Sequence, residues 1–83
     1  MTIARADLAR ACDLAIAGDW AAAHAIVQQD EQDPAACWIH AVLHKIEGDA
    51  GNARYWYTQA GQFYESYGDP IAELRAIRAT LTY

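Results

Sequence analysis

Apolar residues recur along this chain at the spacing of one helix face. In the first segment they stand three or four positions apart, and charged residues occupy the opposite arc. The apolar set there is Leu8, Ala11, Cys12, Ala15 and Ile16. Val, Ile and Thr are scattered without the period-two runs of a strand, so the helical spacing predominates to the C-terminus. The pattern predicts an all-α fold without strands.

Glycine, aspartate and proline divide this pattern into five predicted helices. Gly18 suits the end of one helix and Asp19 the start of the next, and Pro34 suits a first helical turn. The expected helices run over about 3–17, from Trp20 to near Gln29, from Pro34 to about Glu47, from Asp49 to Gly61, and from Pro70 to the C-terminus. Residues 62–67 fit either a loop or an irregular turn.

The Gly18-Asp19 break returns thirty positions later as Gly48-Asp49, which indicates an internal repeat. The unit resembles a tetratricopeptide repeat (TPR), with small residues where two helices cross and an aromatic residue one turn later. The matching residues are Gly48, Ala53, Tyr57 and Ala60, with Ala41 on the preceding helix. The resemblance implies a single domain over 1–83 of five antiparallel helices, in which two TPR-like helix-turn-helix units precede a C-terminal capping helix.

A second resemblance covers the predicted third and fourth helices. The stretch from Trp38 to Gly61, rich in His, Ala, Tyr and Trp, is similar to the signature of a family of small bacterial proteins of unknown function, and Arg75-Ala76-Ile77 fits as well. This resemblance implies no activity. It directs attention to the residues of these two helices.

The predicted third helix carries a face of potential metal ligands. Cys37, His40, His44 and Glu47 lie within about 80 degrees of one another on a helical wheel. His40 and His44, four residues apart, could share a divalent ion, with Cys37 or Glu47 as the third donor. Two alternatives stay open: the histidines form interhelical hydrogen bonds, with Glu47 or a tyrosine hydroxyl of the fourth helix as partner, or they face solvent. No other cofactor is expected.

The same histidines belong to a candidate small-molecule site. Tyr55 lies away from the apolar face of the fourth helix and needs solvent or a partner, and Arg54 beside it could line a groove. The candidate ligand-binding residues are His40, His44, Glu47, Asn52, Arg54 and Tyr55.

Composition and charge restrict the partners and the compartment. The 83 residues carry a net charge of −5, which disfavours nucleic acid and anionic membrane surfaces. The apolar stretches are interrupted by charges well before the roughly 20 residues of a membrane span, and the N-terminus does not look like a signal peptide. Cys12 and Cys37 are expected to be free thiols in the core, as in a cytoplasmic protein.

The aromatic content favours a protein-interaction function. Five tyrosines and three tryptophans are many for so small an interior, so we expect some at an interface. The sequence lacks a phosphate-binding glycine loop and a nucleophile elbow, and we expect no enzyme. The leading prediction is an interaction or assembly module that binds a protein partner or itself as a homodimer; the alternative is a small-molecule or metal-binding protein that uses the face of His40, His44 and Glu47.

Overall fold

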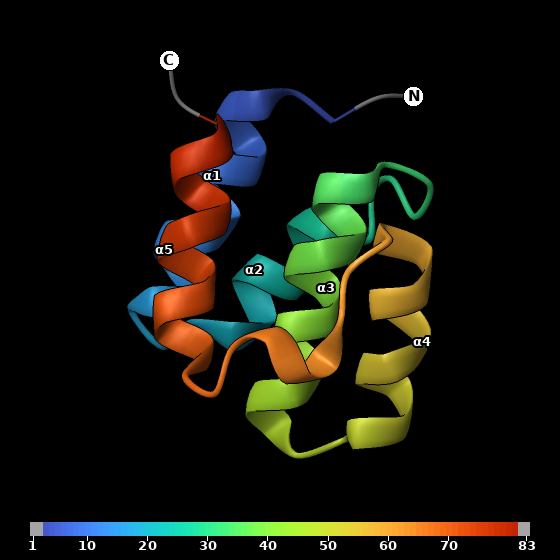
Figure 1. The fold of residues 1–83 in the computed structure, drawn as a ribbon. Helices are drawn as coiled ribbons and strands as arrows, with labels where there is room; N and C mark the ends of the chain where they lie inside the picture. The colour runs from blue at the N-terminus through green and yellow to red at the C-terminus, as the bar shows by residue number, and fades with distance from the viewer. Residues whose placement is uncertain (1–2, 82–83) are drawn as a thin grey trace.

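The computed structural model describes residues 3–81, and within that range the chain forms helices and no strand (Figure 1). A short 3-10 turn, η1, precedes the last of five α-helices. The elements are α1 (Arg5–Ile16), α2 (Trp20–Val27), α3 (Pro34–Glu47), α4 (Ala50–Ala60), η1 (Tyr64–Ser66) and α5 (Pro70–Leu81). The prediction of five helices in an all-α fold is confirmed, and the open segment 62–67 contains the 3-10 turn.

Aspartates cap the N-termini of α2, α3 and α4, as the sequence predicts. The side chain of Asp33 accepts hydrogen bonds from the backbone N–H of Ala35 and Ala36, at 2.8 and 3.1 Å. Asp19 and Asp49 cap α2 and α4 in the same way. α2 ends at Val27, two residues before the predicted end, because the chain there tightens into bonds between residues three apart.

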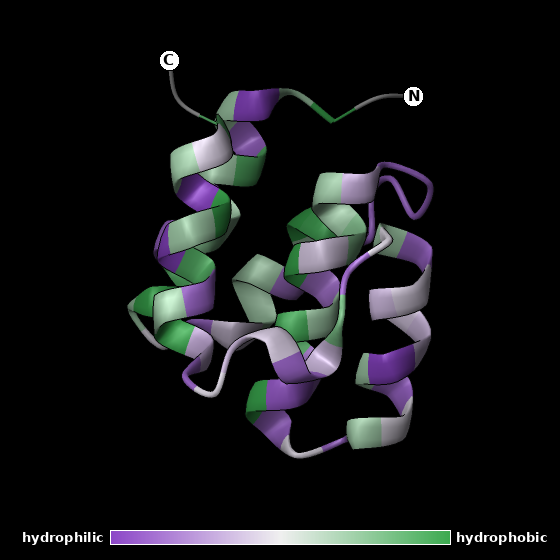
Figure 2. Ribbon diagram, viewed as in Figure 1, coloured by the Kyte–Doolittle hydropathy of each residue, from purple (hydrophilic) through white to green (hydrophobic). Residues whose placement is uncertain are grey.

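α3 is the central helix of the bundle. It packs against α1, α2, α4 and α5. Helices that follow one another along the chain also pair, α1 with α2 and α3 with α4. Figure 1 shows α5 returning to lie beside α1, with the connection from α4 crossing α3. Polar residues fill the connection between α2 and α3 (Figure 2).

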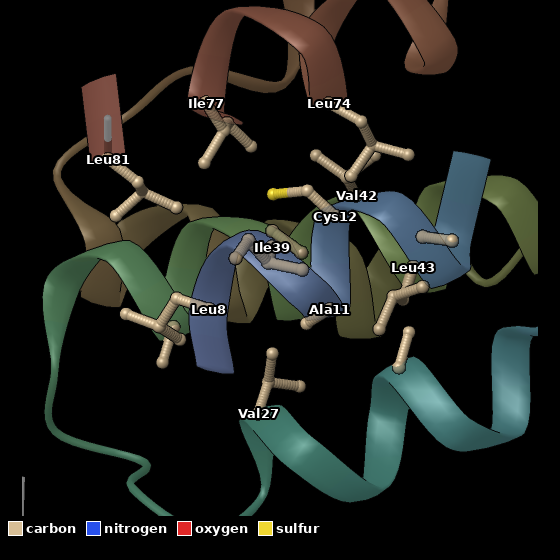
Figure 3. Close-up of a cluster of buried hydrophobic side chains, with 14 of the residues drawn as sticks. Leu8, Ala11, Cys12, Val27, Ile39, Val42, Leu43, Leu74, Ile77 and Leu81 are labelled. Atoms are coloured by element: carbon tan, nitrogen blue, oxygen red, sulfur yellow. The ribbon is translucent and has the colours of Figure 1, made fainter. Parts of the chain in front are cut away.

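The core lies between α1, α3 and α5, and α2 closes it (Figure 3). Its larger side chains are Leu8, Val27, Ile39, Val42, Leu43, Leu74, Ile77 and Leu81. Cys12 and Cys37 are buried free thiols, as predicted. Burial, reinforced by the charge of Asp13, raises the pKa of the Cys12 thiol to about 12. Among the described helices, none combines the length and apolar character that crossing a membrane requires.

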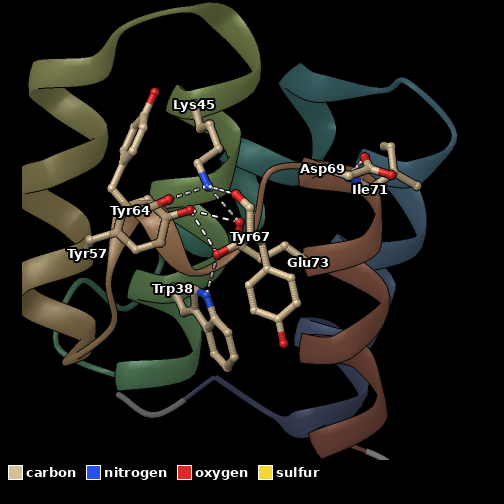
Figure 4. Close-up of polar contacts among 8 residues, drawn as sticks. All are labelled: Trp38, Lys45, Tyr57, Tyr64, Tyr67, Asp69, Ile71 and Glu73. Atoms are coloured by element: carbon tan, nitrogen blue, oxygen red, sulfur yellow. Dashed lines mark hydrogen bonds and ion pairs between the residues drawn. The ribbon is translucent and has the colours of Figure 1, made fainter.

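A buried carboxylate fastens α5 to α3 and α4 (Figure 4). Glu73 of α5 is fully buried, and its oxygens accept hydrogen bonds from Trp38 Nε1 at 2.9 Å and from the Tyr57 hydroxyl at 2.8 and 2.9 Å. Lys45 Nζ forms an ion pair with Glu73 Oε1 at 3.0 Å. Burial and the Glu73 carboxylate raise the pKa of Tyr57 far above its usual value.

The same lysine orders the connection between α4 and α5. Lys45 Nζ donates to the carbonyl oxygens of Tyr64 and Tyr67, at 2.9 and 3.1 Å, and lies over the Tyr64 ring. Residues 61–69 therefore have a defined path across the bundle although they lack regular α-helix. The sequence alone does not predict the structure of this segment, because the lysine that organises it is about twenty residues away.

Candidate metal centre

Three histidines from two helices meet beside α4. His24 of α2 joins His40 and His44 of α3, and one ring nitrogen of each lies within 4.8 Å of the other two. His40 and His44 are 3% and 6% exposed, whereas His24 is half-buried at the edge of the group. We refer to His24, His40 and His44 as the histidine triad.

The spacing of His24 and His40 suits a shared proton or a shared ion. Their Nε2 atoms are 3.1 Å apart, and the rings are almost perpendicular. Without an ion, one Nε2 carries the proton and donates to the other. Two nitrogens on one tetrahedral Zn²⁺, at about 2.0–2.1 Å from the metal, would be about 3.3 Å apart. The spacing of this pair is therefore close to that of two ligands on one ion.

Glu47 holds the third ring of the triad. His44 Nδ1 lies 2.5 Å from Glu47 Oε1, one helical turn further along α3. Because an ionised carboxylate only accepts, Nδ1 carries the proton and Nε2 is left for another partner. Of the alternatives for the histidines, an interhelical hydrogen bond and a bond to Glu47 are both observed. The Tyr57 hydroxyl donates to Glu73 instead.

Two tryptophans hold the rings of His24 and His40 in place. Trp20 stacks on His24 with ring centroids 4.5 Å apart, and its Nε1 donates to the carbonyl of Leu43 at 2.7 Å. Trp56 of α4 stacks on His40 at 3.9 Å, with an angle of 13° between the planes. The orientations of His24 and His40 are therefore set by packing and do not depend on a ligand.

The surroundings favour the neutral forms of His40 and His24. Burial, together with the neighbouring His24 and His44, lowers the pKa of His40 to about 4. Burial and His44 also lower the pKa of His24, although the charges of Glu47 and Glu31 oppose that shift. A neutral imidazole has the lone pair that a metal ligand must offer.

The structure changes the predicted ligand set at one position. His40 and His44 are neighbours, as their spacing predicts, but Cys37 lies outside the triad because its thiol donates to the backbone carbonyl of Glu31 at 3.2 Å. His24 takes the place predicted for Cys37. In the sequence, His24 is marked only by its position four residues after Trp20. Local periodicity cannot show which neighbouring helix the face that carries His24 contacts.

Half of the predicted small-molecule set is at the triad, where His40 and His44 are members and Glu47 bonds to His44, and the other three residues have different contacts. Arg54 forms an ion pair with Glu65 at 2.8 Å and lies over the Tyr64 ring. Tyr55 is exposed and meets Trp56 edge-on, with ring centroids 5.0 Å apart. Asn52 is exposed, and its backbone N–H donates to the Asp49 side chain.

A second group of potential donors adjoins the triad at its exposed side. Asp49 lies with Glu47 and His44, with ligand atoms within 4.8 Å of one another. Asp49 already has a structural role as the cap of α4, and exposed carboxylates are common beside helix ends. We therefore treat Asp49 as part of the surroundings of the triad.

Comparisons with protein families, with curated proteins and with solved structures gave no match for this chain. The resemblances to a tetratricopeptide repeat and to a family of small bacterial proteins stay predictions. The functional argument therefore rests on the geometry of the described residues.

Proposed function

We propose that this protein binds a divalent transition-metal ion through the histidine triad. The observation that carries the proposal is the convergence of three imidazoles within 4.8 Å of one another. Imidazole nitrogens suit Zn²⁺, Cu²⁺, Ni²⁺ and Co²⁺, whereas Mg²⁺ and Ca²⁺ prefer oxygen donors. The neutral state of His40 and its stacking on Trp56 support the proposal, because binding needs neither the loss of an imidazolium charge at His40 nor a large rotation of its ring.

Three protein ligands leave room for a fourth. A tetrahedral ion on His24, His40 and His44 would hold a water or another small ligand at its open position. The bound ion would also replace the hydrogen bond between His24 and His40, since the donating Nε2 must pass its proton to Nδ1 before it can act as a ligand. These features suit an ion-binding role and require no reaction at the bound ion.

Co²⁺ titration tests the proposal. Bound Co²⁺ absorbs visible light according to its coordination, so the titration gives both stoichiometry and geometry. We expect one Co²⁺ per chain, displaced by Zn²⁺, and a loss of affinity of more than about tenfold in His24→Gln. His24 is the best position to vary because it is only half-buried, and the fold should tolerate the change.

Cys37→Ala is the matched control for this titration. Cys37 was predicted as a ligand from the same helix, but its thiol bonds to the Glu31 carbonyl, so its removal should leave Co²⁺ affinity unchanged. Failure of the wild-type protein to bind Co²⁺ or Zn²⁺ would contradict the proposed function. Equal affinity of His24→Gln and the wild type would remove His24 from the site.

A second candidate function, an interaction or assembly module, rests on one exposed side chain. Phe63 is 73% exposed and borders a surface depression of about 210 Å³ with Arg54 and Tyr64. A second copy of the chain could cover Phe63 and form the homodimer expected from the aromatic content. The TPR-like pairing of α1 with α2 and of α3 with α4, and a cytoplasmic setting that keeps both thiols free, belong to this proposal.

Sedimentation velocity at increasing protein concentration tests the assembly proposal. We expect a dimer whose population falls in Phe63→Ser, because the substitution removes the exposed apolar contact. Gln59→Ser, at an exposed position of α4 outside that depression, is the control and should associate like the wild type. A wild-type protein that stays monomeric at high concentration would contradict this second candidate.

A further inference from the structure

Glu47 orients His44 but is not a member of the histidine triad. Glu47 is in the last turn of α3, and its carboxylate bonds to His44 Nδ1, which leaves Nε2 as the ring nitrogen available to an ion. Its side chain is 39% exposed, whereas that of His44 is 8% exposed. Glu47 therefore contacts both the buried ring and solvent.

This contact determines which nitrogen of His44 is a ligand. A neutral imidazole has one N–H and one lone pair, and the bond to a carboxylate fixes the N–H at Nδ1. The lone pair is then at Nε2. Without Glu47, both tautomers would be available to His44, and part of the population would have a proton where the ion needs a lone pair.

The carboxylate of Glu47 can also act on an ion in the triad. Its Oε1 lies 2.5 Å from one ring nitrogen of His44, so its negative charge favours a cation held by the other nitrogen of that ring. Glu47 is therefore a counter-charge bonded directly to one of the proposed ligands.

We propose that Glu47 is a positioning residue of the metal site, which fixes His44 as the Nδ1–H tautomer and offsets part of the charge of the ion. This proposal rests on the proposed function of the triad. It differs from the sequence-based prediction, in which Glu47 was a candidate ligand. Two measurements on the full chain test it, one without metal and one with Co²⁺.

The first measurement is the tautomer of His44 in the metal-free protein, read from the ¹⁵N chemical shifts of its ring nitrogens. We expect Nδ1–H in the wild type and a mixture of both tautomers in Glu47→Ala. Glu47→Gln should keep Nδ1–H, because its amide oxygen can still accept the bond. A wild-type tautomer with the proton at Nε2, or no change in Glu47→Ala, would overturn the proposal.

The second measurement is Co²⁺ affinity. Glu47→Ala should bind about 10- to 100-fold more weakly than the wild type, which is the usual effect of losing a residue that supports a ligand. Glu47→Gln should lose less affinity, because it keeps the orientation of His44 and removes only the charge. All three proteins should keep the fold, since Glu47 is partly exposed at a helix end.

Asp49→Asn is the matched control for charge. Asp49 is an exposed carboxylate close to His44, and Asn caps a helix as well as Asp does. We expect affinity near that of the wild type in Asp49→Asn. Equal losses in Asp49→Asn and Glu47→Ala would overturn the positioning role in favour of general surface charge. Absence of Co²⁺ binding in the wild type would overturn both this proposal and the proposed function, whereas wild-type binding with unchanged affinity in Glu47→Ala would overturn only this one.

Discussion

Glu73 is the residue whose role is hardest to recognise from the sequence. An acidic side chain in the first turn of a helix is ordinarily exposed to solvent and interacts favourably with the helix dipole. Here the carboxylate is fully buried, and its partners Trp38, Tyr57 and Lys45 are 35, 16 and 28 positions away. Since no local pattern encodes contacts over such distances, sequence reasoning could not identify this network.

Removal of the Glu73 carboxylate should destabilise the fold strongly. Glu73→Ala leaves the Lys45 ammonium buried with two carbonyl partners but no counter-charge, and such unpaired charges cost about 3–5 kcal/mol. Tyr57→Phe keeps the ion pair and removes one donor, so its cost should be about 1.5–3 kcal/mol. Urea denaturation followed by circular dichroism measures both. Similar unfolding free energies for wild type and Glu73→Ala would contradict this account of the network.

The buried thiol of Cys12 should make the protein less stable in alkali. Its pKa is about 12 in the fold against 9.0 when unperturbed, so above pH 9 the unfolded chain releases a proton that the folded chain keeps. The unfolding free energy should therefore fall by up to about 1.4 kcal/mol per pH unit between the two values. Denaturation at pH 8, 9 and 10 measures the slope, and Cys12→Ala should flatten it. An equal slope in Cys12→Ala would assign the effect to other groups, such as Tyr57.

At the scale of the elements, the sequence predicts most of what the structure contains. Caps and breaks are local chemistry, so Asp33, Asp49 and Gly48 mark helix ends that the structure reproduces. The His40–His44 neighbourhood is equally local, because residues four apart share a helix face. The contribution of α2 is different: His24 reaches the triad only through the packing of α2 on α3, which no single-helix pattern specifies.

Replacement by alanine should have opposite effects on stability at two glycines near one turn. Gly48 ends α3 in the left-handed conformation, with φ of +85°, and an added Cβ would meet nothing within 4 Å. Gly48→Ala should therefore cost about 1 kcal/mol through backbone strain alone. Gly51 lies inside α4 with equally open surroundings, so Gly51→Ala should stabilise the fold by about 0.5 kcal/mol. Urea midpoints compare the two, and equal signs would contradict the assigned conformations.

At the scale of the whole molecule, the triad couples an ion to the arrangement of the bundle. The Glu73 network joins α5 to α3 and α4, whereas the triad and its two stacked tryptophans join α2 and α4 to α3. An ion held by α2 and α3 would connect the parts of the chain on either side of residues 28–33. Ion binding should therefore stabilise the complete fold.

Metal should raise the melting temperature of the protein and a chelator should reverse the rise. An ion that binds the folded state alone adds about 2.7 kcal/mol of stability at a free concentration 100 times its dissociation constant. Scanning calorimetry with Zn²⁺, and then with excess EDTA, measures the effect. His24→Gln should show little change with Zn²⁺, and an equal rise in that variant would indicate binding elsewhere.

The stacking of two indoles on the triad gives the protein an internal optical label. Trp20 and Trp56 lie in ring contact with His24 and His40, and Trp38 is held separately by Glu73. An open-shell ion such as Cu²⁺ quenches fluorescence at short range, so the emission of Trp20 and Trp56 should fall as the site fills. Occupancy of the site could then be followed in an unlabelled sample, by light that the protein itself emits.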